Sequence, residues 1–144
     1  MNENPKKVKI EYCWDGHTLV EECVESFEQL EHRLQELKKR SGELAGKKQC
    51  VYTVDVVIEN TGRMSVALDE NCILMFYDEV DDCYLTSLGN PSAEGFTEAL
   101  YDFGQLAEQP NKYIVQYNDA LAVLKDWIVS KKLNTRISWT DEID

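Results

Sequence analysis

Four carboxylates within five residues form the densest group of potentially reactive side chains in this sequence: Asp78, Glu79, Asp81 and Asp82. Such a cluster could bind calcium, but an EF-hand loop needs alternating oxygen donors, a central Gly and a terminal Glu, and that spacing is absent. A carboxylate pair could also hydrolyse a glycoside if a sugar-binding cleft surrounded it. The ordinary alternative for a single run of charge is a solvated turn.

The histidines and cysteines complete no recognisable catalytic or metal-binding set. We expect His17 and His32 to be ordinary surface residues. The five cysteines include no Cys-x-x-Cys pair, so a zinc site of the usual kind is not expected. We expect reduced, mostly buried thiols, with Cys72 protonated and inert inside an apolar strand. The enzymatic alternative is a small hydrolase that combines Asp78 or Asp82 with His17, but we expect no enzyme and no cofactor.

The acidic character extends well beyond this cluster. No Lys or Arg lies between Arg63 and Lys112, whereas ten of the 27 acidic residues do. The chain has 15 basic residues and a net charge of −12, so residues 64–111 supply −10 and the remainder is nearly balanced. We call residues 64–111 the acidic stretch. An isoelectric point near 4.6 argues against binding to nucleic acid or anionic membranes and favours a basic partner.

The bulk composition predicts one globular domain. A chain of 144 residues with 43% hydrophobic residues can bury a sizeable core. No run approaches the roughly 18 apolar residues that a membrane span needs, and the N-terminus shows no secretory signal. We therefore expect a cytoplasmic protein, with polar, frayed ends at residues 1–7 and 141–144.

The N-terminal third predicts a hairpin followed by a helix. Residues 8–12 alternate apolar and polar positions, and residues 18–24 can return as a second strand after the Asp15-Gly16 turn. Ser26 with Gln29 forms a capping box, after which apolar residues follow at spacings of three and four. The apolar stripe is Phe27, Leu30, Leu34 and Leu37, and Gly42 and Gly46 are expected to end the helix.

The middle of the chain predicts an antiparallel meander. Residues 49–59, 63–68, 72–77 and 83–87 are rich in Val, Ile, Tyr and other strand formers, and short polar turns separate them. The carboxylate cluster forms the turn between the last two of these strands. Charges at such turns discourage strand edges from pairing with other chains.

Residues 89–144 are less regular. Gly89-Asn90-Pro91 interrupts the strand pattern, and residues 97–102 could form a helical turn or a strand. Residues 113–117 predict a short strand, and Asn118 is the expected N-cap of a second helix whose apolar stripe includes Trp127. Residues 135–139 predict a final strand. Together the elements indicate an α+β fold: an antiparallel sheet of about five to seven strands with two main helices.

A compact fold without a catalytic set but with one strongly acidic side is most consistent with a protein that acts by being bound. Charge complementarity would speed association with a basic partner, and aromatic side chains would supply affinity. Of the aromatic residues, Tyr84 is the one that we expect to face outward. The candidate partner-binding residues are Asp78, Glu79, Asp81, Asp82, Tyr84, Glu94, Phe96, Glu98, Tyr101 and Asp102.

The C-terminal third carries a recognisable order of motifs. Asn118-Asp119-Ala120-Leu121 opens the second helix, which runs through Trp127-Ile128 and is followed by Lys131-Lys132 and a strand that ends at Trp139. This order resembles the end of the first Imm family of bacterial immunity proteins, which occur beside polymorphic and contact-delivered toxins. The apolar strand before Asp78, then Tyr84 and Gly89-Asn90, are similar to the family's central strands and small-residue turn. The resemblance spans roughly residues 24–142 and leaves out the hairpin at 8–24.

The resemblance implies a cytoplasmic antitoxin that binds one cognate toxin domain and covers its active site. Toxins paired with this family include nucleases and nucleic-acid deaminases, which agrees with a basic partner. It also implies structural roles for Trp127, Trp139, Gly89 and Asn90, and we expect a monomer. An acidic adaptor or a DNA mimic in another complex is the alternative.

Overall fold

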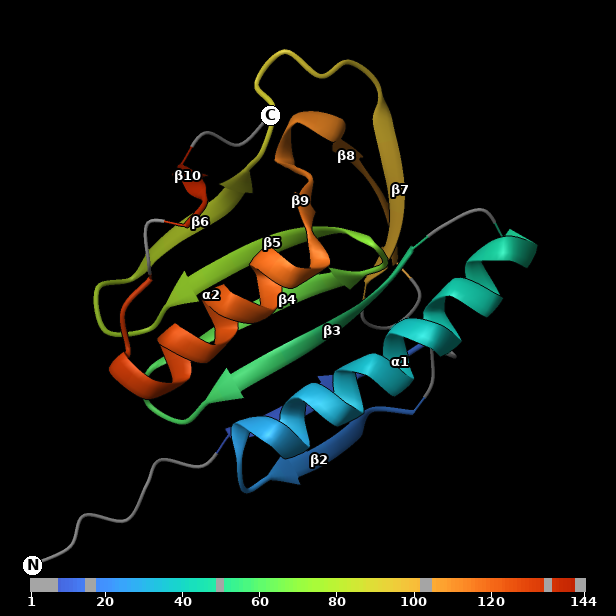
Figure 1. Cartoon of the computed structure of the whole chain (residues 1–144). Helices are drawn as coiled ribbons and strands as arrows, with labels where there is room; N and C mark the ends of the chain where they lie inside the picture. The colour runs from blue at the N-terminus through green and yellow to red at the C-terminus, as the bar shows by residue number, and fades with distance from the viewer. Residues whose placement is uncertain (1–7, 15–17, 49–50, 102–104, 134–135, 142–144) are drawn as a thin grey trace, which may run out of the picture.

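The computed structural model describes residues 8–14, 18–48, 51–101, 105–133 and 136–141 and shows an α+β domain (Figure 1). Residues 1–7 and 142–144, which include most of the two expected frayed ends, lie outside these ranges. In chain order the elements are β1 (Val8–Tyr12), β2 (Val20–Val24), α1 (Phe27–Lys48), β3 (Val51–Ile58), β4 (Gly62–Leu68), β5 (Asn71–Asp78), β6 (Cys83–Leu88), β7 (Phe96–Tyr101), β8 (Gln105–Pro110), a 3-10 turn (Asn111–Tyr113), β9 (Val115–Gln116), α2 (Tyr117–Ser130) and β10 (Ser138–Thr140).

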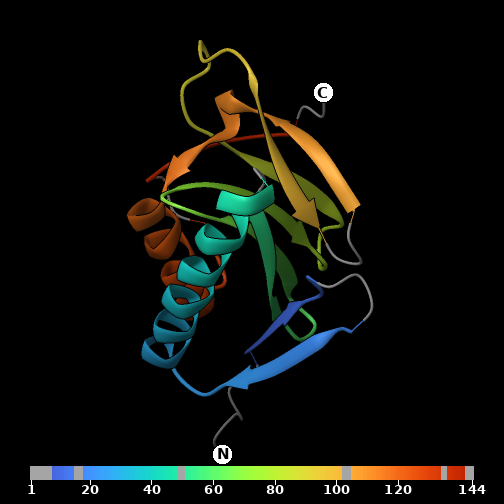
Figure 2. The same ribbon diagram turned by 90° about the vertical axis from the view of Figure 1, so that its right-hand side faces the viewer.

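The sheet is mostly antiparallel, and its main path follows the order β10-β6-β5-β4-β3-β1-β2. Both α-helices cover one face of it, and the other face carries no α-helix among the described residues (Figure 2). We call this second face the helix-free face. The β7–β8 hairpin joins the start of β3 through a short parallel contact, on the edge that β1 occupies farther along β3. The predicted α+β class, antiparallel sheet and two main helices are thus confirmed, and the described residues contain more strands than the sequence distinguished.

Helix α1 begins as predicted but ends later. The Gln29 N–H donates to Ser26 Oγ (3.1 Å), while Gln29 Oε1 accepts the Glu25 N–H (2.6 Å), one residue before the expected position. The helix continues through Gly42 and Gly46 to Lys48, so the prediction that these glycines end it is wrong. Buried Ser41 explains the continuation, because its hydroxyl donates to the Leu68 carbonyl (2.9 Å) and accepts the Tyr52 N–H (3.1 Å), tying the helix to the sheet.

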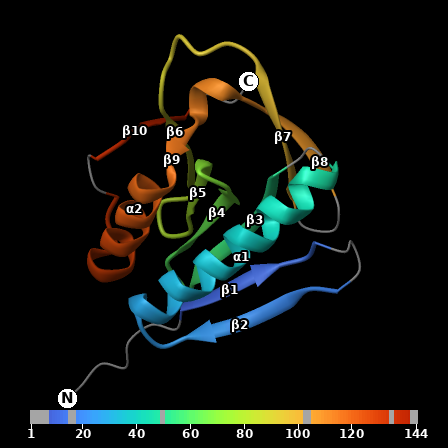
Figure 3. The same ribbon diagram turned by 45° about the vertical axis from the view of Figure 1, so that its right-hand side comes forward.

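The core lies between the two helices and the sheet. Alternate residues of β1, β3, β4 and β5 point toward the helices, as a strand period of two requires. Helix α1 runs along the β1–β2 hairpin and β3 (Figure 3). On α2, fully buried Trp127 meets the ring of Phe76 edge-on at 5.4 Å, and Trp139 of β10 approaches the same ring at 6.4 Å. Both tryptophans therefore contribute to the core.

Helix α2 begins two residues earlier than predicted. Gln116 occupies the N-cap position and makes no side-chain cap, so the prediction of Asn118 as the cap is wrong. A backbone carbonyl from another segment of the same chain substitutes for a side-chain cap, because the Tyr117 N–H donates to the Glu70 carbonyl (3.0 Å) just before β5. Asp119 lies in the first turn as expected and pairs with Arg136 (2.6 Å).

The break after β6 depends on a close approach between backbones. A Cβ atom on Gly89 would lie 1.8 Å from the carbonyl oxygen of Ile114, so only glycine fits there. The Gly89 N–H donates to the Lys112 carbonyl (2.8 Å), and the side chain of Asn90 accepts the Ser92 N–H (3.0 Å). Gly89 and Asn90 therefore shape the start of the segment that leads to β7.

Candidate functional site

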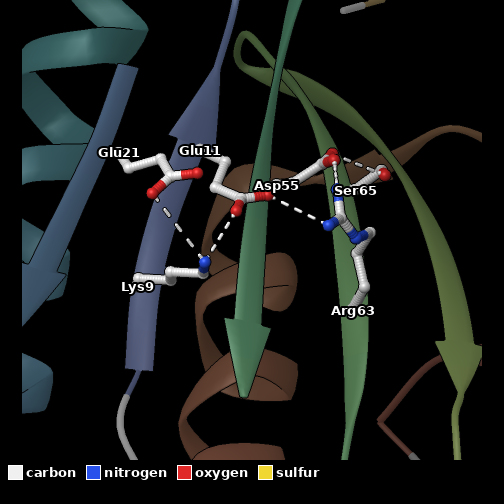
Figure 4. Close-up of polar contacts among 6 residues, drawn as sticks. All are labelled: Lys9, Glu11, Glu21, Asp55, Arg63 and Ser65. Atoms are coloured by element: carbon white, nitrogen blue, oxygen red, sulfur yellow. Dashed lines mark hydrogen bonds and ion pairs between the residues drawn. The ribbon is translucent and has the colours of Figure 1, made fainter. Parts of the chain in front are cut away.

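The helix-free face carries a group of five charged side chains and one serine in contact with one another, which we call the polar cluster: Lys9, Glu11, Glu21, Asp55, Arg63 and Ser65 (Figure 4). These residues come from β1, β2, β3 and β4, which lie side by side in the sheet. In each of β1, β3 and β4 they alternate with residues that point into the core, so the pleat places them on the opposite face. The register sets Glu11 directly opposite Asp55.

Arg63 holds the two facing carboxylates together. Its Nη2 lies 3.0 Å from Glu11 Oε2, and its Nη1 lies 2.5 Å from Asp55 Oδ2. Glu11 and Asp55 are each only 6% exposed, so these charges need such partners. Ser65 also donates to Asp55 Oδ1 (2.6 Å), and Lys9 lies 2.9 Å from Glu11 and 4.0 Å from Glu21. The hydrogen bond to Glu11 raises the pKa of Lys9 above its ordinary value.

Sequence reasoning missed the polar cluster. In the sequence, Asp55 is the single interior charge of an otherwise uncharged strand. A charge in that position is itself a signal, because a buried carboxylate requires a partner from a neighbouring strand. Glu11 and Asp55 are largely buried and paired with a cation. The cluster therefore stabilises this face of the sheet and leaves neither of these two carboxylates free to bind a ligand.

A pocket of about 330 Å³ adjoins the polar cluster on the helix-free face. Arg63 and Ser65 border it on one side, and residues of β5 and β6 line it, including Met75, Tyr77 and Tyr84. Glu108 and Gln109 of β8 and Asp141 after β10 also line it. In Figure 2 the β7–β8 hairpin lies on the side of the sheet away from both helices, which places β8 at this pocket.

Two tyrosines give the pocket an aromatic wall. The rings of Tyr77 and Tyr84 are stacked, with centroids 4.6 Å apart and planes inclined by 30°. Tyr84 is 62% exposed, so the prediction that it faces outward is confirmed. The Tyr77 hydroxyl donates to Asp82 Oδ1 (3.0 Å), and this hydrogen bond is the main cause of the raised pKa of Tyr77.

The predicted carboxylate cluster forms the β5–β6 turn, and its four members have different roles. Asp78 Oδ1 accepts the N–H groups of Val80 (2.9 Å) and Asp81 (3.2 Å), so Asp78 shapes the turn, and Asp82 accepts from Tyr77. Glu79 and Asp81 are exposed. The other side of the turn borders a hollow of about 510 Å³ that it shares with Lys131 and Lys132 after α2.

The second predicted group lies along β7 and the segment before it. Glu94, Phe96 and Glu98 are exposed, and Phe96 is 64% exposed. Tyr101 ends β7, and Asp102 lies outside the described residues. Glu98 faces Glu108 of β8 across the hairpin. Glu108 lines the same pocket as Tyr77 and Tyr84, whereas Tyr84 is the only predicted partner-binding residue among the described residues that line it.

Most carboxylates of the acidic stretch are not neutralised. Within the described parts of the chain, Glu70, which pairs with Lys38, is the only acidic residue of the stretch in an ion pair. Three of the five large hydrophobic side chains that are exposed among the described residues also lie in this stretch: Val80, Tyr84 and Phe96. Exposed apolar anchors among unpaired charges are typical of a surface that binds another protein.

The remaining candidates do not form a reactive site in the described residues. His32 is exposed, with its Nε2 3.4 Å from Glu36, and His17, on which the hydrolase alternative depends, lies outside the description. No described group of His, Cys, Asp and Glu could hold a metal. The described part of the chain also contains no helix long and apolar enough to cross a membrane.

The cysteines are less buried than predicted. Cys13 and Cys72 are buried, but Cys23 and Cys83 are exposed, because Cys23 lies on the edge strand β2 and Cys83 follows the acidic turn. Cys50 lies outside the described residues. Burial raises the pKa of the Cys72 thiol to about 11, which confirms the prediction that it is protonated at neutral pH.

No protein-family model matches this chain, and no curated protein matches it in sequence. Any function for this site must therefore be inferred from its geometry.

The facing pair Glu98 and Glu108 tests whether the acidic residues of this surface lower the stability of the fold, as expected if they serve binding. Like charges directly opposite on neighbouring strands destabilise a hairpin. We expect Glu98→Lys to stabilise the protein by about 0.2–1 kcal/mol, because it replaces this repulsion with an attraction. Urea denaturation of Glu98→Lys beside Glu98→Gln measures the effect, and a variant less stable than wild type would contradict it.

Proposed function

We propose that this protein is an immunity protein, an antitoxin that binds a basic bacterial toxin domain and covers its active site. The observation that carries this proposal is the helix-free pocket, where 62% exposed Tyr84 stands on the wall with Glu108 and Asp141, two carboxylates that form no ion pair with a described residue. Aromatic anchors contribute affinity, whereas the uncompensated charge accelerates encounter with a positively charged partner.

The arrangement fits inhibition without any chemistry of its own. The buried charges of the polar cluster already bind one another, and they give the sheet a defined face. The exposed carboxylates at the β5–β6 turn and on the β7–β8 hairpin can occupy positions that substrate phosphates would take on a nuclease or a nucleic-acid deaminase. The resemblance to the first Imm family supports the same proposal, together with a cytoplasmic location and a monomer.

Co-expression tests the proposed function. The candidate partner is the product of the gene next to the one that encodes this protein, expressed in a bacterial host from a separate inducible promoter. We expect the host to survive when the antitoxin is present, and we expect the purified proteins to form a complex that lacks toxin activity. Continued killing at full antitoxin expression, or turnover of a substrate by this protein alone, would overturn the proposal.

A further inference from the structure

The pocket on the helix-free face has the chemistry of a receptor for one side chain. Its volume of about 330 Å³ lies at the lower end of the range of about 300–1,000 Å³ that is usual for small-molecule sites. Its walls combine the stacked rings of Tyr77 and Tyr84 with the carboxylates of Glu108 and Asp141. An occupant of this pocket must therefore satisfy both an aromatic surface and negative charge.

The charges around the pocket select a cation. Arg63 is the one basic residue among the described residues that line it, and its guanidinium is bound to the largely buried carboxylates of Glu11 and Asp55. Its charge is therefore offset from within the sheet. Neither Glu108 nor Asp141 forms an ion pair with any described residue, and an anionic occupant would meet their repulsion.

The aromatic wall favours a planar cation over a compact one. A guanidinium can lie flat on a tyrosine ring while its edge donates to a carboxylate, whereas an ammonium is more strongly hydrated and cannot stack. Tyr84 is exposed enough to offer one ring face, and Tyr77 holds it from behind. Arginine is also among the residues that most often dominate the energy of protein interfaces.

We propose that this pocket receives a single arginine side chain of the partner, with the guanidinium stacked on Tyr84 and paired with Glu108 or Asp141. The proposal rests on the proposed function for the identity of the partner, but the pocket's preference for arginine is a property of this chain. It therefore allows a test that does not need the toxin.

The first experiment titrates the isotope-labelled protein with N-acetyl-arginine methylamide and follows amide chemical shifts. We expect saturable shifts at Tyr84, Thr86 and Glu108, about tenfold weaker binding of the lysine analogue, and about tenfold weaker binding of the arginine probe to Tyr84→Ala. Tyr84→Phe, which keeps the ring, should recover most of the lost affinity. Equal binding of both probes, or no shifts at the pocket, would overturn the proposal.

The second experiment measures the complex with the cognate toxin domain. We expect Tyr84→Ala and Glu108→Gln each to raise the dissociation constant about tenfold or more, mainly through faster dissociation. Glu43→Gln, which removes one exposed charge from the helix side, is the matched control and should have a much smaller effect. Tight binding by both pocket variants would overturn the arginine pocket and leave the antitoxin function standing. A toxin that is not bound at all, by a protein that binds the arginine probe, would overturn the proposed function alone.

Discussion

Replacement of Arg63 by leucine is expected to lower the free energy of unfolding by an amount toward the lower end of about 3–5 kcal/mol, the cost of removing one partner of a buried ion pair, because the two carboxylates are buried although the Arg63 side chain itself is 42% exposed. Glu11 and Asp55 are each 6% exposed and face each other across β1 and β3, so without Arg63 two negative charges would remain close together and poorly hydrated. Lys9 would still contact Glu11, and Ser65 would still contact Asp55. These remaining contacts place the effect nearer the lower end of the range.

The comparison with an exposed pair separates burial from mere ion pairing. Arg136 pairs with Asp119 at 2.6 Å, but the Asp119 side chain is 35% exposed, against 8% for those of Glu11 and Asp55, so Arg136→Leu should cost no more than about 1 kcal/mol. Urea denaturation of both variants at neutral pH measures the difference. Equal losses in the two variants would mean that burial of the polar cluster adds nothing.

A rescue variant shows whether the loss at Arg63 comes from uncompensated charge. Combining Arg63→Leu with Glu11→Gln and Asp55→Asn removes both carboxylates along with the guanidinium. We expect this triple variant to recover much of the stability, because neutral amides are far less costly to bury than unpaired carboxylates. A triple variant no more stable than Arg63→Leu would show that Arg63 acts through the packing of its side chain instead.

The sequence predicts those elements whose character is local. The alternation in residues 8–12 and the spacing of Leu30, Leu34 and Leu37 identify β1 and α1, because hydrophobic period directly reflects which face is buried. By contrast, β8 (Gln105–Pro110) has no strong strand signal, and it adopts its conformation by pairing with β7. The end of α1 was also predicted wrongly, since a tertiary contact through Ser41 outweighs the local effect of glycine.

The same distinction applies to the candidate site. The acidic turn is contiguous in sequence, and its charge and the exposure of Tyr84 could be predicted from the residues alone. The polar cluster depends on β1 lying beside β3, and the pocket depends on β8 lying near β5 and β6. Neither arrangement is encoded in a local pattern. The different roles of the turn carboxylates could also not be predicted from the sequence. Hydrogen bonds in the structure show that Asp78 shapes the backbone, which leaves the exposed Asp81 carboxylate for a partner.

Because Glu79 and Asp81 are exposed and their carboxylates do not shape the turn, they are the residues with which to test the acidic surface. If the proposed function holds, reversal of Glu79 and Asp81 to lysine is expected to slow association with the toxin partner about 10- to 100-fold at low salt, because electrostatic steering contributes about 10- to 1,000-fold to association rates. Asp78 and Asp82 stay unchanged, since their carboxylates form hydrogen bonds within the turn and with Tyr77. The neutral variant Glu79→Gln/Asp81→Asn should show an intermediate rate.

Stopped-flow measurements over a range of salt concentrations distinguish steering from a local contact. The wild-type association rate should fall as salt rises, whereas that of the reversed variant should depend on salt much less, because screening removes the same interaction. Glu36→Lys/Glu43→Lys on α1 changes the net charge equally but on the helix side, so it should slow association much less. If both double reversals slow association alike, net charge alone attracts the toxin. If only the turn matters and the dissociation rate is unchanged, the turn guides the toxin to the surface and the aromatic pocket holds it there.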